Sequence, residues 1–195
     1  MIIRNKQLKK MKQIYFLLMS IFLTSCTIFK NNSSTSTIVS CNYNEKKNQT
    51  EYMVFPYGQV SISGKWERTS YNSVSKQHFF MNPDSIIIAI GFGPYNKYEF
   101  NKDGTKKGFE FIKAFYEWEA EYFATYNLDT EEIESDTTNH FIIWRLYGNY
   151  KDTFVDTYFL FGEKNGFVKN FAVMITEKWT REQKIDFLKN MYLKE

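Results

Sequence analysis

The sequence has few of the residues on which most catalytic sites and disulfide frameworks depend. It contains 2 histidines, His78 and His140, and 2 cysteines, Cys26 and Cys41. A nucleophile needs a base within hydrogen-bonding reach and a third group that orients the base, and no spacing in the chain indicates such a set. A P-loop, a dinucleotide-binding fingerprint, a paired Cys-x-x-Cys motif and a nucleophile elbow are also missing. The sequence therefore predicts a non-catalytic protein and gives no basis for a bound cofactor or metal ion.

Hydrophobic runs long enough to cross a bilayer are missing too. The N-terminal apolar run, Ile14–Leu23, has 10 residues, whereas a transmembrane helix needs about 20. It follows a basic segment, Met1–Lys12, that carries five Lys and Arg residues and no acidic one. The small residues Thr24 and Ser25 come next. A basic segment, a short apolar segment and small residues in this order are typical of a secretory signal peptide, here residues 1–25.

The end of this leader, Leu23-Thr24-Ser25-Cys26, resembles the lipobox of bacterial lipoproteins. The resemblance implies that the Cys26 thiol receives a diacylglyceryl group, that cleavage makes Cys26 the first residue, and that its amine gains an acyl chain such as palmitate. Several chains are needed because a single acyl chain binds a membrane only weakly and reversibly. Thr27 stands where an Asp would favour the inner membrane, so the resemblance implies the periplasmic face of the outer membrane. The alternatives are an ordinary signal peptide followed by a chance cysteine, and an uncleaved N-terminal anchor.

Positive charge is concentrated in the leader. The whole chain has 25 Lys and Arg against 22 Asp and Glu, and five of the basic residues precede Cys26. The remaining 20 basic and 22 acidic residues give the rest of the chain a net charge of about −2. Proteins that bind nucleic acids normally present a basic surface, so we expect no nucleic-acid partner.

Residues 26–51 are rich in Ser, Thr, Asn and Lys. Such a composition buries too little apolar surface to offset the entropy of ordering. The sequence therefore predicts a flexible tether between the lipid anchor and a single domain at residues 52–195. Lipidation uses Cys26, which leaves Cys41 alone in an oxidising compartment, where structural cysteines come in pairs. We interpret Cys41 as an unpaired thiol within the tether; the alternative is an intermolecular disulfide.

Strand patterns recur along the predicted domain. The run Gln59–Trp66 alternates apolar and small polar residues, which predicts a half-buried strand that bends at Gly64. Further strands are predicted at residues 76–81, 86–90, 131–135, 141–147, 154–161 and 167–176. The links between the last three strands are short, and one contains Asn165-Gly166, a strong hairpin signal. Because short links make neighbouring strands antiparallel, we expect a largely antiparallel sheet.

Two amphipathic helices complete the predicted fold. Over residues 107–125, aromatic side chains recur every three or four positions, as on a buried helix face; they are Phe111, Phe115, Trp118 and Tyr122. The run Thr180–Gln183 is a capping box, and a second apolar stripe follows it at Ile185, Leu188 and Tyr192. A largely antiparallel sheet flanked by two amphipathic helices is an α+β fold.

The order of these elements resembles the PsbP-type α/β/α sandwich. That family often opens with an alternating strand that ends in Gly-x-Trp, here Gly64-Lys65-Trp66, and continues with a hairpin, a long helix, a meander and a C-terminal helix. The resemblance covers Tyr57 to Leu193 and leaves residues 129–136 without a counterpart. It implies a domain that binds other proteins as a scaffold or accessory factor, and it carries over no functional residue.

The remaining candidates for chemistry favour structural roles. His78 and His140 lie beside aromatic residues at or within predicted strands, as structural or exposed histidines do. The run Asn101–Gly104 is similar to the start of a Ca²⁺-binding loop, but its twelfth position is Ile112 where that loop has Glu. The acidic residues of 131–136 are expected to be solvated.

Aromatic content is the most unusual feature, with 19 Phe, 14 Tyr and 4 Trp. Tyr95, Tyr98 and Tyr150 fall in predicted loops and are candidates for a recognition surface, because Tyr offers a large contact area at a low cost in entropy. A coding bias would produce the same count. The leading hypothesis is a lipid-anchored envelope protein that binds a protein partner. The alternatives are a carrier of a small apolar or sugar ligand, held between the sheet and the long helix, and a hydrolase whose site the sequence does not reveal.

Overall fold

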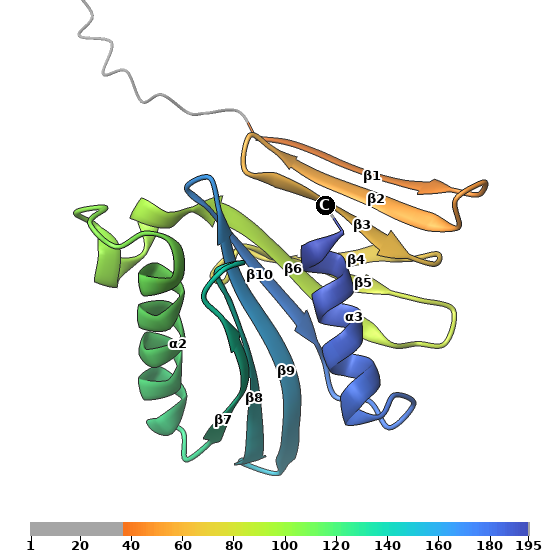
Figure 1. Ribbon diagram of the computed structural model, residues 1–195. Helices are drawn as coiled ribbons and strands as arrows, with labels where there is room; N and C mark the ends of the chain where they lie inside the picture. Colours follow the sequence, from red (N-terminus) through yellow and green to blue (C-terminus); the bar gives the residue numbers. More distant parts are fainter. Residues whose placement is uncertain (1–36, 195) are drawn as a thin grey trace, which may run out of the picture. The chain divides into compact units, whose positions relative to one another are not determined.

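The computed structural model describes residues 37–194, and the first strands of this part of the chain form a three-stranded antiparallel sheet (Figure 1). Its strands are β1 Ile38–Asn44, β2 Gln49–Phe55 and β3 Gly58–Ser63, in the order β1-β2-β3. Buried and exposed residues alternate along β2 and β3. One face of this small sheet therefore packs on the protein core.

The sequence predicted a flexible tether up to residue 51, but residues 38–51 form β1, a turn and the start of β2. β1 pairs with β2 along its whole length, from Ile38 opposite Phe55 to Asn44 opposite Gln49. Hydrogen bonds along the backbone order this polar strand, and they leave no signal in its composition. The domain therefore begins at least as early as Ile38, not at residue 52; residues 26–36 lie outside the described part of the chain.

Seven antiparallel strands form the second sheet, in the order β4-β5-β6-β10-β9-β8-β7. They are β4 Glu67–Asn72, β5 Gln77–Met81, β6 Ile87–Pro94, β7 Asp129–Asp136, β8 Phe141–Tyr150, β9 Thr153–Lys164 and β10 Phe167–Val173. The strands predicted for this region are confirmed, and the meander of the last three pairs as expected. β4 was not predicted, because all six of its residues are exposed and carry no apolar alternation.

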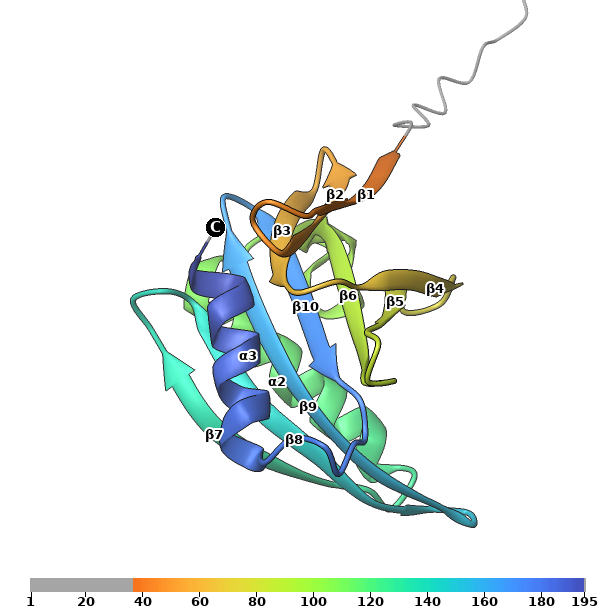
Figure 2. The same cartoon turned by 90° about the vertical axis from the view of Figure 1, so that its right-hand side faces the viewer.

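The helices α2 Gly108–Ala124 and α3 Arg181–Leu193 pack on opposite faces of the large sheet (Figures 1 and 2). Two short 3₁₀ turns, η1 Tyr95–Lys97 and η2 Glu99–Asn101, precede α2. The capping box is confirmed: the Gln183 backbone N–H donates to the Thr180 hydroxyl, and the Thr180 backbone N–H donates to the Gln183 side chain at 2.8 Å. The predicted α+β fold is confirmed.

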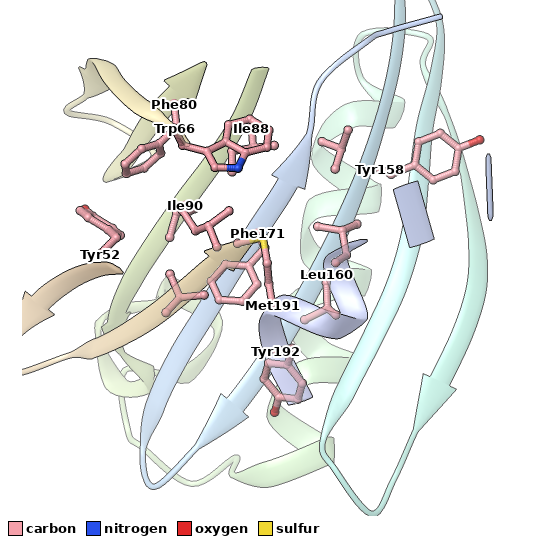
Figure 3. Close-up of a cluster of buried hydrophobic side chains, with 14 of the residues drawn as sticks. Tyr52, Trp66, Phe80, Ile88, Ile90, Tyr158, Leu160, Phe171, Met191 and Tyr192 are labelled. Carbon is pink, nitrogen blue, oxygen red and sulfur yellow. The ribbon is translucent and has the colours of Figure 1, made fainter. Parts of the chain in front are cut away.

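Alternation along β9 sends its side chains into two cores. Tyr158 and Leu160 join the core under α3, whereas Phe159 and Phe161 face α2. Figure 3 shows the core under α3, where side chains from both sheets and from α3 converge; among them are Tyr52, Trp66, Phe80, Ile90, Phe171, Met191 and Tyr192. Under α2, the Phe115 ring stacks on Phe161 with 3.9 Å between centroids. Ring stacking thus forms part of the contact between the large sheet and α2.

A largely buried charge cluster joins α3 to β8 and β9. The Lys184 side chain is 5% exposed, and its Nζ lies 3.4 Å from Asp156 Oδ2. The other carboxylate oxygen of Asp156 accepts a hydrogen bond from Arg145 Nε at 2.6 Å. Because a buried ammonium group is costly without a partner, Asp156 fixes the position at which α3 can pack.

Candidate functional site

Cys26, the predicted lipid attachment site, lies outside the described residues. Cys41 lies in β1, opposite Tyr52 on β2, and its thiol is free and half-buried. Burial raises the pKa of the Cys41 thiol, and the nearby Arg68 lowers it to a smaller extent. A thiol with a raised pKa is a poor nucleophile near neutral pH, so the position of Cys41 favours packing over chemistry.

His78 sits where the small sheet meets β5. Its Nδ1 lies 2.6 Å from the Tyr52 hydroxyl, and its ring lies 4.5 Å from the ring of Tyr71. Burial lowers the pKa of His78, and the positive charge of Arg68 lowers it further. An imidazole that hydrogen-bonds a buried tyrosine joins the two sheets, and no carboxylate within residues 37–194 is hydrogen-bonded to it.

His140 has a carboxylate nearby. Its Nδ1 lies 3.9 Å from Glu163 Oε2, and that carboxylate already accepts hydrogen bonds from the backbone N–H groups of Gly108 and Gly166. Glu163 therefore satisfies an unpaired donor at the start of α2. The Tyr192 hydroxyl donates to the Asn139 carbonyl at 2.7 Å and lies 3.2 Å from the carbonyls of His140 and Glu163.

Side chains of the calcium-like turn and of the acidic run also form hydrogen bonds within the fold. In the predicted calcium-like turn, the buried Asn101 side chain donates to the carbonyls of Tyr95 and Lys106. Asp136, at the end of the acidic run, accepts hydrogen bonds from the backbone N–H groups of Thr138 and Asn139. Within residues 37–194, no three His, Cys, Asp or Glu side chains converge as metal ligands would.

The acidic run itself forms β7, an edge strand that contacts α3. Arg181 binds Glu131 through two hydrogen bonds of 2.6 and 3.2 Å, and Lys189 binds Glu134 at 2.6 Å. These side chains are about one-third exposed, so each pair contributes modestly. They do show that the acidic run is partly paired, where the sequence predicted a solvated stretch.

Of the three tyrosines proposed for recognition, Tyr150 is the one whose side chain is exposed, at 36%. Tyr95 and Tyr98 pack against the core under α2, where their rings lie 6.3 and 5.5 Å from that of Phe111. Burial raises the pKa of the Tyr98 hydroxyl, and the negative charge of Glu119 adds to the effect. Tyr95 and Tyr98 therefore help to seat α2.

Tyr150 instead joins an exposed aromatic cluster, which we name the tyrosine surface: Trp118, Tyr122, Tyr126 and Tyr150. Their exposed fractions lie between 36% and 50%. The rings of Tyr122 and Tyr126 are 5.2 Å apart and their hydroxyls 3.1 Å apart, and the ring of Tyr126 lies 5.4 Å from that of Tyr150. Tyr122, Tyr126 and Tyr150 thus form a row of contacting rings between the C-terminal end of α2 and the β8–β9 hairpin, and Trp118 lies one helical turn before Tyr122.

The predicted stripe along α2 is confirmed for Phe111 and Phe115 but wrong for Trp118 and Tyr122. In the second half of α2, the face toward the sheet instead includes Tyr116 and Phe123, whose rings lie 5.6 and 6.4 Å from the ring of Trp144. At about 100° per residue, the four aromatic residues lie within about 60° of one another, so the stripe itself is straight. It runs along one edge of the buried face, where the rings of Tyr98 and Phe100 cover Phe111 and Phe115 but leave Tyr122 exposed.

Charge around the tyrosine surface is mixed. The Lys151 ammonium lies 5.2 Å from the centre of the Tyr150 ring, as in a cation–π contact. The exposed carboxylates of Glu117 and Glu121 lie on the same helix as Trp118 and Tyr122. A face of this composition can offer stacking, hydroxyl hydrogen bonds and attraction for cations to a partner.

No known protein family matches this chain. No curated protein matches it either. None of the helices in the described part of the chain is long and apolar enough to span a membrane.

Proposed function

We propose that this protein is a lipid-anchored lipoprotein of the bacterial cell envelope whose domain binds a protein partner without catalysis. The tyrosine surface is the observation that carries the proposal. Large exposed apolar patches on a soluble domain mark interaction sites, and Tyr and Trp are enriched among the residues that dominate binding energy at interfaces. The lipobox and the resemblance to PsbP-type domains support the same role.

The composition of the tyrosine surface suggests what its partner presents. Aromatic faces attract the guanidinium of Arg or the ammonium of Lys, and Lys151 already lies over the ring of Tyr150. Glu121 adds negative charge beside Trp118 and Tyr122, whereas Glu117 pairs with Lys113 at 4.0 Å. A partner with apolar and basic side chains on one face is complementary to this surface.

The lipid anchor is tested by labelling cells with a palmitate analogue. We expect label in the wild-type protein and in the Cys41→Ala variant, and none in the Cys26→Ala variant, which should also leave the membrane fraction. The Cys41 variant is the matched control, since it removes the other cysteine. Label that persists after Cys26→Ala would refute the anchor.

The tyrosine surface is tested separately by photo-crosslinking in cells, with the full chain. A photoreactive phenylalanine analogue placed at Tyr122 or Tyr150 should give a discrete adduct with a partner protein. The same analogue at Val74, which is 90% exposed on the β4–β5 hairpin, should give none. Equal adducts at all three positions, or none at either tyrosine, would show that this surface has no specific partner.

A further inference from the structure

A second candidate site lies on the other side of the large sheet, at one end of α3. An open cleft of about 340 Å³ runs between the end of β3, the turn 82–84 and the segment before α3. Pockets that bind small molecules start at about 300 Å³, so the cleft is large enough for a ligand. Its lining residues come from these three segments and from α3 itself; they are Ser63, Gly64, Lys65, Trp66, Asn82, Pro83, Asp84, Trp179 and Phe187.

Three aromatic rings build one wall of the cleft. The Trp179 ring lies 4.8 Å from that of Phe187, and the Trp66 ring lies 5.6 and 6.3 Å from Phe187 and Trp179. Trp66 is almost wholly buried, and its indole N–H donates to the Ser63 carbonyl at 2.9 Å. Trp66 therefore fixes the wall, while the partly exposed rings of Trp179 and Phe187 can meet a ligand.

Polar groups form the opposite rim. The Asn82 side-chain oxygen accepts a hydrogen bond from the Ile86 backbone N–H at 2.8 Å, which holds the amide in place and leaves its amino group available. The Lys178 ammonium donates to the Asp84 carbonyl and so ties the rim to the segment that carries Trp179. The Asp84 carboxylate is exposed and forms no ion pair or hydrogen bond with another described residue.

The cleft continues along α3 as a smaller, more polar hollow. This hollow has a volume of about 100 Å³ and shares Ser63 and Phe187 with the cleft. Its further lining includes the side chains of Gln49, Ser61 and Asn190. An aromatic wall that leads into a row of amides and hydroxyls suits an extended ligand with many hydroxyl groups.

We propose that the cleft binds an oligosaccharide, with one sugar ring stacked on Trp179 and Phe187. A pyranose ring has an apolar face of C–H groups and an edge of hydroxyls, which matches an aromatic wall opposite a carboxylate and an amide. An acyl chain would need an enclosed apolar cavity, but this cleft is open and polar on one side. The saccharide proposal depends neither on Cys26 nor on the tyrosine surface.

Titration of the full chain with tetrasaccharides of glucose and of N-acetylglucosamine, followed by tryptophan fluorescence, tests the proposal. We expect saturable binding of at least one of them, weakened by roughly tenfold or more in Trp179→Ala and Asp84→Ala. Glu177→Ala, an exposed change in the same segment that does not line the cleft, should bind as the wild type does. Asp84→Ala leaves the aromatic wall intact, so its result stands even if Trp179→Ala unfolds the protein.

Several results would overturn the saccharide site. One is the absence of saturable binding by either tetrasaccharide at millimolar concentration. Another is binding that Asp84→Ala leaves unchanged. A third is displacement of the sugar probe by laurate or by a proline-rich peptide that binds more tightly, which would identify an apolar or peptide ligand instead. Tyr122→Ala should not alter sugar binding, so this experiment fails or succeeds independently of the proposed protein partner.

Discussion

Glu119 provides a quantitative test of how α2 packs on the sheet. It lies on the sheet-facing side of the helix, one turn from Phe115 and Phe123, whereas its neighbours Glu117 and Glu121 are exposed. Burial raises the pKa of Glu119 from its ordinary value of 4.5 to about 7. A carboxylate in this position loses hydration, and no described residue donates a hydrogen bond or forms an ion pair with it.

The raised pKa makes stability depend on pH in a known direction. Between pH 4.5 and 7 the folded state holds a proton on Glu119 that the unfolded state has released, so the free energy of unfolding falls as pH rises through this window. Each unit of difference between the two pKa values corresponds to about 1.4 kcal/mol. Above pH 7, the ionised Glu119 therefore lowers the free energy of unfolding by about 3 kcal/mol. Because Glu119 is only partly buried, we expect about 2 to 3 kcal/mol.

Glu119→Gln removes the titration but keeps the shape of the side chain. Both proteins are denatured with urea at a series of pH values. The free energy of unfolding of the variant minus that of the wild type should rise by about 2 to 3 kcal/mol between about pH 4.5 and about pH 8. Glu121→Gln, on the exposed face of the same helix, should show a change below about 0.5 kcal/mol over this range. A Glu119→Gln difference that stays constant with pH would refute the reasoning.

Two further stability predictions use the same urea assay. Asp156→Ala leaves the buried Lys184 ammonium without its carboxylate and should lower the free energy of unfolding by about 3 kcal/mol. A decrease below about 1 kcal/mol at every pH would mean that the Lys184 ammonium has another partner. Gly162→Ala places a Cβ into the buried ring of Tyr192 and should cost about 1 to 3 kcal/mol, whereas Gly93→Ala, with open space around the new Cβ, should be nearly neutral. Equal costs for the two glycine variants would contradict the packing of α3.

Local patterns in the chain were enough to identify most of the elements. Strand-forming runs joined by short links in 141–176 mark the meander, and Thr180–Gln183 carries the capping box whose two hydrogen bonds the structure contains. These features repeat with a period of two or three to four residues, or lie within a single helical turn. A signal of that kind is complete in the segment itself, so no knowledge of distant residues is needed to read it.

The candidate sites depend on contacts that no local pattern contains. β1 and β4 are ordered by backbone pairing with a neighbouring strand, and their own side chains show little of it. The tyrosine surface exists because α2 leaves Trp118 and Tyr122 facing outward beside a hairpin some 25 to 30 residues later in the chain. The aromatic cleft brings residues 63–66, 82–84 and 179–187 together. Packing between such distant segments is a property of the whole fold, because each segment buries its surface only against the others.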